Sequence, residues 1–160
     1  MAMATSRGGR THLPGPCAPL AAVLCAALAL PGILAAQEAS PPPFTEEQAE
    51  AGAGVYSAHC AQCHGPALKG TVAPPLVGKA FRANWYVGDR TLGDLFDQIA
   101  RYMPMTAPGS LTKEQYAALT AFILLRNGHE ANGDVLVADR EALGAYPLVP
   151  PGGEPEEEGR

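Results

Sequence analysis

The sequence predicts a small domain that is mostly helical. Segments 91–103 and 111–128 place apolar residues three and four positions apart, which is the spacing of one face of a helix. No segment shows the alternation of apolar and polar residues that is typical of a half-buried strand, and the chain contains no internal repeat. These observations favour an all-α fold.

The first expected helix begins after Phe44. Thr45, with Gln48 three residues further on, fits a capping box at a helix start. Gly52 and Gly54 lower the helix propensity of the residues that follow. Two interpretations stay open: a weak helix, or a helix whose small residues let another helix cross it closely.

Two further helices are expected in the second half of the chain. Thr91 and Asp94 are placed to cap segment 91–103, whose apolar face consists of Leu92, Leu95, Phe96 and Ile99. Segment 111–128 starts at Thr112 with Gln115, and Gly128 fits its end. Its apolar stripe consists of Tyr116, Leu119, Phe122 and Ile123.

The remaining segments contain fewer signals for regular structure. Residues 69–89 are expected to be irregular, because glycines and prolines interrupt them repeatedly. A short helical turn is expected from Asp139 to Leu143.

The chain begins with the pattern of a secretory signal peptide. Arg7 and Arg10 precede an uncharged run over residues 13–36, and small residues offer cleavage near Ala36. The alternative is an uncleaved N-terminal membrane anchor that leaves the domain facing the periplasm. The expected organisation is therefore a signal peptide (1–36), a flexible leader (37–43), one domain (44–150) and an acidic disordered tail (151–160).

Charge and cysteine content narrow the possible functions. The full chain has 11 basic and 16 acidic residues, and removal of residues 1–36 takes away two arginines, which leaves a formal charge of −7. This balance argues against nucleic-acid binding, which needs basic patches to neutralise phosphates. Of the 4 cysteines, only Cys60 and Cys63 remain in the exported chain.

The sequence Cys60-x-x-Cys63-His64 has three interpretations: a redox-active thiol pair, half of a zinc site, or a covalent attachment site for haem. A structural zinc site needs a second pair of ligands, and the exported chain offers only His59 and His129 besides. A thioredoxin-like site would need a βαβ pattern, which is missing. Covalent haem is favoured, with each thiol bonded to one haem vinyl group and the histidine within reach of the iron.

The opposite face of such an iron has two candidate ligands, Met103 and Met105. Pro104 biases Met103 towards extended backbone, which suits a ligand on a loop after a helix. Any methionine can instead fill a gap in the core. Met103 is the favoured ligand, with Met105 as a residue of the pocket wall or an alternative ligand. A filled distal face favours electron transfer, and an open one favours reactions with oxygen, peroxide or gases.

These motifs resemble those of class I c-type cytochromes. The shared features are CAQCHG at 60–65, PPLVG at 74–78, the dipeptide MP at 103–104 and a closing helix. More closely, the chain is similar to the single-haem cytochrome c domains associated with periplasmic quinoprotein (PQQ-dependent) dehydrogenases, over about residues 44–150.

The resemblance implies a small cytochrome c fold, in which the N- and C-terminal helices cross and loops enclose one covalent haem. Gly52 is expected at that crossing, together with Tyr116 or Phe122. The implied thioether links are Cys60 and Cys63, and the implied iron ligands are His64 and Met103.

Two further residues receive functions from the resemblance. The carbonyl of Pro74 would accept a hydrogen bond from His64, although Pro74 can also be an ordinary loop proline. Trp85 would lie near a haem propionate, with a core indole as the alternative.

The expected function is a periplasmic single-electron carrier with no catalytic residues. The resemblance suggests a PQQ-dependent dehydrogenase as the donor, and an oxidase or another cytochrome as the acceptor. The protein would act as a monomer or as a dehydrogenase subunit. The rival function is a haem enzyme or a gas-binding protein with an open distal site.

Overall fold

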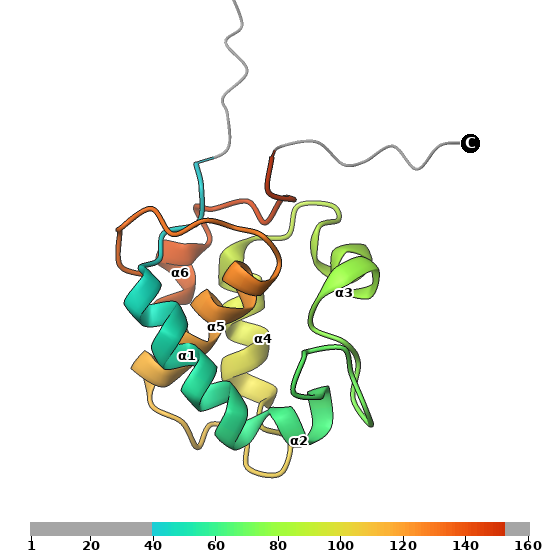
Figure 1. Ribbon diagram of the computed structural model, residues 1–160. Coiled ribbons are helices and arrows are strands. Elements are labelled where there is room, and N and C mark those ends of the chain that lie inside the picture. Colours follow the sequence, from blue (N-terminus) through green and yellow to red (C-terminus); the bar gives the residue numbers. More distant parts are fainter. Residues whose placement is uncertain (1–39, 153–160) are drawn as a thin grey trace, which may run out of the picture. The chain divides into compact units, whose positions relative to one another are not determined.

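The computed structural model describes residues 40–152 (Figure 1). Its helices are α1 (Glu46–His59), α2 (Ala61–His64), α3 (Gly78–Trp85), α4 (Leu92–Tyr102), α5 (Lys113–Arg126) and α6 (Arg140–Leu143). Within these residues the only β-type pairing is one antiparallel bridge between Thr91 and Pro147. The all-α prediction is confirmed. No described helix has the length and apolar character that a membrane span requires.

The two ends of the chain fall largely outside this description. The expected signal peptide, most of the expected leader and most of the expected acidic tail lie outside the described residues. Pro42 and Pro43 are buried, so packing against the domain begins before Phe44.

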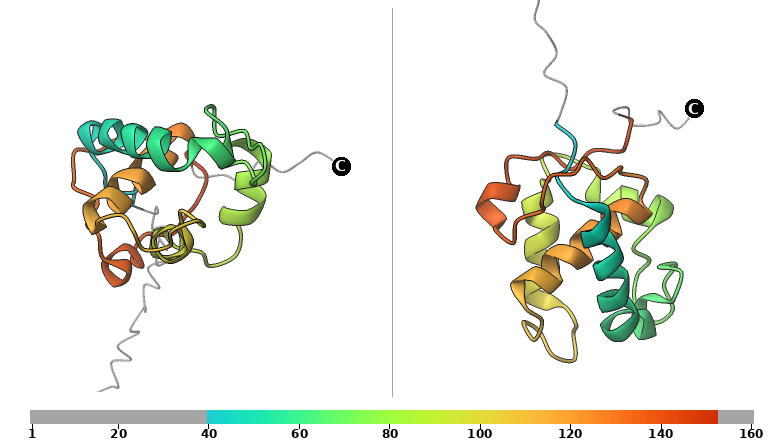
Figure 2. Two further views of the ribbon diagram at one scale, coloured as in Figure 1. Left: turned by 90° about the horizontal axis from the view of Figure 1, so that it is seen from below. Right: turned by 60° about the vertical axis from the view of Figure 1, so that its left-hand side comes forward.

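Helices α1 and α5 cross in close contact, which both views of Figure 2 show. A Cβ atom added to Gly52 would lie 1.9 Å from the carbonyl oxygen of Ala118 and 2.8 Å from Cβ of Phe122. The prediction of a close crossing at Gly52 is therefore confirmed, with Phe122 as the partner. Gly54 has no atom within 4 Å of its added Cβ, so it takes no part in the crossing.

Local sequence signals define the helix ends as predicted. Each of α1, α4 and α5 begins with a capping box, in which the N-cap side chain and the side chain three residues later bond each other's backbone N–H group. The three pairs are Thr45 with Gln48, Thr91 with Asp94, and Thr112 with Gln115. Gly128 follows α5 with φ of +93°, a conformation that favours glycine.

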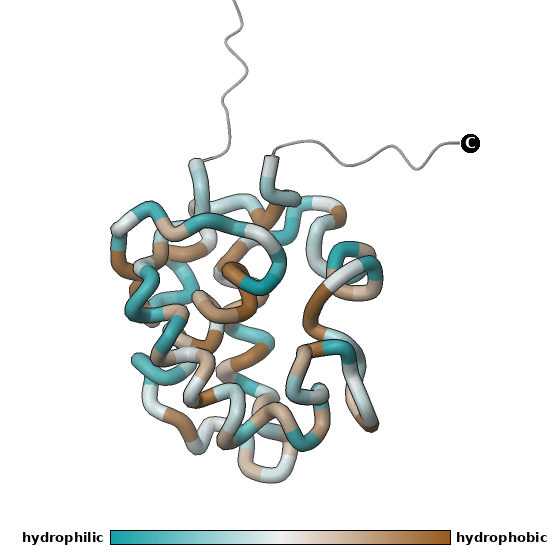
Figure 3. The backbone as a smooth tube through the Cα atoms, viewed as in Figure 1, coloured by the Kyte–Doolittle hydropathy of each residue, from teal (hydrophilic) through white to brown (hydrophobic). Residues whose placement is uncertain are grey.

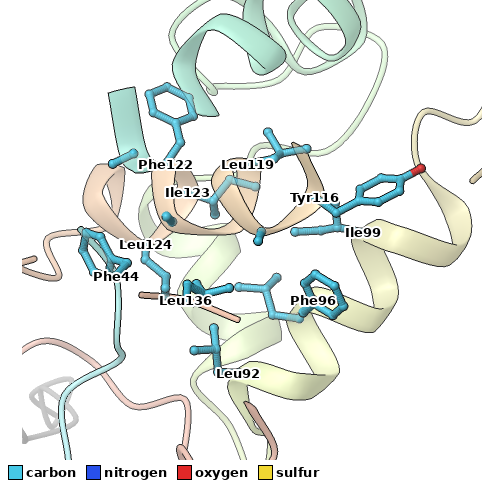
Figure 4. Close-up of a cluster of buried hydrophobic side chains, with 14 of the residues drawn as sticks. Phe44, Leu92, Phe96, Ile99, Tyr116, Leu119, Phe122, Ile123, Leu124 and Leu136 are labelled. Atoms are coloured by element: carbon cyan, nitrogen blue, oxygen red, sulfur yellow. The ribbon is translucent and has the colours of Figure 1, made fainter. Parts of the chain in front are cut away.

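The core is built around α5. Residues Tyr116 to Leu124 are buried without interruption, so α5 is covered on most of its circumference and not only along the expected stripe. Figure 4 shows Phe122 projecting towards α1, while Phe96 and Ile99 approach α5 from α4. Figure 3 shows the corresponding pattern of hydropathy, with polar residues along α1 and α3 and apolar residues along α5.

One sequence expectation was wrong. Residues 69–89 were expected to be irregular, but α3 forms between Gly78 and Gly88. The seven residues after Gly78 contain neither glycine nor proline, and Phe81 anchors this short helix by its burial. The flanking glycines bound the helix without interrupting it. The short helical turn expected near Asp139 is confirmed as α6, with Asp139 as its N-cap.

We predict that Gly52→Ala destabilises the protein by about 1–3 kcal/mol or more, because the added methyl group overlaps the Ala118 carbonyl and forces α1 and α5 apart. Gly54→Ala is the matched control on the same helix. It should be neutral or stabilise by about 0.5–1 kcal/mol, because alanine has the higher helix propensity and meets no neighbour. Chemical denaturation of both holoproteins measures the difference. Equal stability of the two variants would contradict the close crossing.

Candidate functional site

The Cys60–His64 cluster lies where α1 ends and α2 begins. Cys60 is both the C-cap of α1 and the N-cap of α2, and His64 is the last residue of α2. The Cys60 side chain is buried and that of Cys63 is exposed, and no disulfide joins them. Burial, with a smaller contribution from the neighbouring Cys63, raises the pKa of the Cys60 thiol to about 11. The cluster therefore presents two unpaired thiols and a buried imidazole within one helical turn.

The buried His64 ring is fixed by the carbonyl group of Pro74. Its Nδ1 atom lies 2.7 Å from the Pro74 oxygen. A carbonyl oxygen can only accept, so Nδ1 carries the hydrogen in this bond. In the neutral imidazole the lone pair is then on Nε2. This tautomer can bind a metal through Nε2.

The loop after α2 is held against the cluster by short hydrogen bonds. The hydroxyl group of Tyr56 donates to the carbonyl of Gly65 at 2.5 Å. The hydroxyl group of Thr71 donates to the carbonyl of Cys63 at 2.6 Å. The N–H of Gly70 donates to the carbonyl of His64 at 2.8 Å. These bonds close a tight loop that returns the chain to Pro74, so the position of the Pro74 carbonyl is set by the cluster itself.

Met103 stands at the end of α4 in the conformation that the sequence predicts. It is the C-cap of α4 with φ of −118° and ψ of 146°, an extended backbone. Its carbonyl accepts a hydrogen bond of 2.8 Å from the hydroxyl group of Tyr116. The side chain of Met103 is half-buried, whereas that of Met105 is 77% exposed.

The cluster and the Met103 loop lie at the same end of the described unit. In both side views, α2 and the loop after α4 are at the end remote from the points where residues 40 and 152 leave the unit (Figures 1 and 2). Two separate elements, α2 and the end of α4, therefore lie at the same end of the unit.

Trp85 is half-buried at the end of α3. Its ring lies 6.3 Å from that of Phe81, and the guanidinium carbon of Arg90 lies 4.9 Å from the indole ring centre. Trp85 is thus an edge residue of the core, and a guanidinium group covers one face of its ring.

Three polar residues near the site were missed by the sequence analysis. Asn127 donates to the carbonyl of Leu76 at 2.9 Å, and the hydroxyl group of Tyr86 lies 2.9 Å from Nε2 of the buried His129. Burial lowers the pKa of His129 to about 4 and raises the pKa of Tyr86 to about 12. These pairs tie residues 76–86 to the end of α5. Their partners are 51 and 43 residues apart in the chain, so no local pattern indicates them.

These residues fit a covalently held haem better than the alternatives. The thiols are three positions apart at the N-cap and first turn of α2, the imidazole has Nε2 available, and a thioether lies at the same end of the unit. Among residues 40–152 no group of three or more histidine, cysteine or acidic side chains is placed to bind a metal ion.

Comparisons with known proteins agree with this site. Residues 47–123 match the family described as cytochrome C oxidase, cbb3-type, subunit III. The fold is similar to a chain of the sulfane dehydrogenase SoxCD from Paracoccus pantotrophus, with a TM-score of 0.50, 24% sequence identity and coverage of 76% of this chain and 62% of that one. At this identity the likeness shows the fold. A search of the curated proteins finds no match.

We predict that His129 makes stability depend on pH between about 4 and 6.5. In this interval the unfolded chain binds a proton at position 129 and the folded chain does not, so stability falls as the pH is lowered. The loss amounts to about 3 kcal/mol across the interval. His129→Gln should flatten the dependence, which denaturant unfolding at several pH values measures. His59→Gln is the control, because His59 is exposed. An unchanged slope in His129→Gln would refute this account.

Proposed function

We propose that this protein, whose residues 47–123 match a cytochrome family, is a c-type cytochrome and a single-electron carrier with one covalently attached haem c. The observation that carries the proposal is the hydrogen bond from Nδ1 of His64 to the Pro74 carbonyl, which directs the Nε2 lone pair away from the loop. When bound, haem c supplies an Fe(III)/Fe(II) couple that gains and loses one electron without forming a bond to a substrate.

The first contribution of the chain would be to attach the haem covalently. Cys60 and Cys63 would each form one thioether link. Theirs is the only Cys-x-x-Cys-His sequence in the chain, which supports a single haem. Cys60 lies between α1 and the 4-residue helix α2, which carries Cys63 and His64. The same turn would therefore fix the attachment points and the first iron ligand.

The axial ligands would set the redox properties. The Pro74 carbonyl orients the His64 ring and increases the basicity of Nε2. Met103 would provide the second ligand, and Tyr116 restrains its backbone through the carbonyl. A thioether favours Fe(II), so a His/Met pair gives a higher reduction potential than two histidines. Trp85 would line the site near a haem propionate.

The compartment and the partners follow from the sequence. The proposed location is the periplasm, after cleavage of the signal peptide (1–36) near Ala36, with the leader at 37–43, the domain at 44–150 and the tail at 151–160. The proposed donor is a dehydrogenase, for which the sequence resemblance favours a PQQ-dependent one. The proposed acceptor is an oxidase or another cytochrome. The protein would be a monomer or a dehydrogenase subunit, and not itself an enzyme.

The carrier function predicts that both axial positions are occupied by side chains. The holoprotein should take up and release one electron reversibly in a spectroelectrochemical titration. Carbon monoxide at neutral pH should leave the spectrum of the reduced, folded protein unchanged, because no axial position is open. Rapid formation of a carbon monoxide complex would instead favour the enzyme or gas-binding function.

The ligand assignment predicts different effects of two methionine substitutions. Met103→Ala should abolish the weak methionine–iron absorption band of the oxidised protein, lower the reduction potential and open the iron to carbon monoxide. Met105→Ala is the matched control in the same loop and should leave all three unchanged, because its side chain is exposed. Loss of the band in Met105→Ala alone would move the ligand to position 105.

A further inference from the structure

A groove lies at the opposite end of α1 from the cysteines. It is formed by the first turns of α1 and α5 and by residues 135–138, and it encloses about 470 Å³. Ala51, Ala117 and Ala118 contribute to its floor, and Glu47 and Glu114 are among its lining residues. The α1 and 130–138 parts lie together on the left of Figure 1. The groove is thus apolar between two carboxylates.

One wall of the groove is the segment 135–138. Val135 is 62% exposed, Leu136 1% and Val137 46%, so the side chains alternate as along an extended chain. The side chain of Gln48 accepts from the N–H of Leu136 and donates to its carbonyl, both at 2.9 Å. In an extended chain the N–H and C=O groups of the two neighbouring valines face the other way. Within residues 40–152 these groups form no hydrogen bond.

The charge around the groove is negative. Local hydrogen bonds lower the pKa values of Glu47 and Glu114, so both are ionised at neutral pH. A second groove, of about 420 Å³, continues from Glu47 and is lined by Glu46, Thr45 and residues 131 and 133. Lys113 is the basic neighbour of Glu114. An apolar groove therefore passes into an acidic one, with Glu47 shared by both.

We propose that this composite groove docks an extended segment of a partner protein that carries a large aliphatic side chain next to lysine or arginine. The segment would lie against the exposed side chains of Val135 and Val137. Its aliphatic side chain would occupy the apolar groove, and its basic side chain would meet Glu46 and Glu47.

The negative charge of the groove disfavours two other occupants, a second copy of this chain and the chain's own C-terminal sequence. A second copy of this chain would bring the same carboxylates together across a two-fold axis, and like charges at an interface are repulsive. The chain's own C-terminal sequence, EPEEEGR, carries four acidic residues, so its charge does not complement the groove. A basic partner would complement the negative charge of both grooves.

The docking surface is separate from the redox site. Glu47 and Cys60 are thirteen residues apart on one continuous helix and its cap, which corresponds to roughly 20 Å. A partner held in the groove therefore leaves the Cys60–His64 end accessible. The proposal goes beyond the electron-carrier function and does not depend on it.

The test uses isotope-labelled, reduced holoprotein and a small set of capped pentapeptides, KVLVK, RILIR and KLILR. Peptide binding should shift the amide resonances of residues 135–138 and of Glu47. The double variant Glu46→Gln/Glu47→Gln should weaken binding roughly fivefold, because exposed ion pairs each contribute a fraction of a kcal/mol. Glu50→Gln is the matched control, since Glu50 is exposed on α1 and does not line the groove.

A second pair of variants tests the apolar contact. Val137→Ser should weaken binding roughly tenfold, since it removes most of the apolar surface that a partner would cover there. Val87→Ser is the control, because Val87 is 45% exposed, as Val137 is at 46%, and lies outside the groove. Thermal melts of the variants verify that each one folds.

Any of four results would overturn the proposal. The shifts could centre on residues outside the groove, or no peptide of the set could bind at millimolar concentration. The acidic peptide EVLVE could bind as well as KVLVK, which would exclude charge recognition. The peptide KSGSK could bind as well as KVLVK, which would exclude the apolar contact. None of these results bears on the spectra or the carbon monoxide test of the redox site.

Discussion

The close contact between α1 and α5 determines where the functional residues lie. A glycine at position 52 lets the α1 backbone approach the Ala118 carbonyl to a distance that no side chain would permit. Because α1 runs without interruption from this contact to Cys60, a change in the crossing would move the cysteines and His64 as a unit. The aromatic pair of Tyr56 and Phe122, with ring centres 5.4 Å apart, supports the same crossing one turn further on.

Polar side chains of α5 and of its C-terminal end hold the loops in place through hydrogen bonds. Loop carbonyls that are removed from water need donors, and the donors here come from one buried helix. Tyr116 bonds the carbonyl of Met103 near the start of α5, and Asn127 bonds the carbonyl of Leu76 at its end. The chain segments on the two sides of the site are thereby both anchored by hydrogen bonds to one element, α5 and its C-cap. A substitution that shortens either side chain would leave a loop carbonyl unpaired and the loop less restrained.

The sequence predicts those features that depend on neighbours along the chain. Capping boxes and apolar stripes involve residues within a few positions, and the Cys60–His64 motif carries its chemistry in five residues. The extended backbone of Met103 follows from Pro104 alone. The pairing of Tyr86 with His129 and the polar function of Tyr116 depend on the folded path, so sequence assigns Tyr116 only to an apolar stripe. The helix α3 was missed because glycines at its ends resemble interruptions.

The separation of the groove from the redox end has a physical consequence for a carrier. Electron exchange favours small contacts that dissociate rapidly, but a partner must also be present often enough to exchange. A second contact roughly 20 Å away along α1 would raise the effective concentration of a tethered partner without enlarging the contact at the cysteines. Because α1 is rigid and fixed by its crossing with α5, the two contacts would keep a constant separation. The same helix that leads to the Cys60–His64 cluster would then also set the distance at which a partner is held.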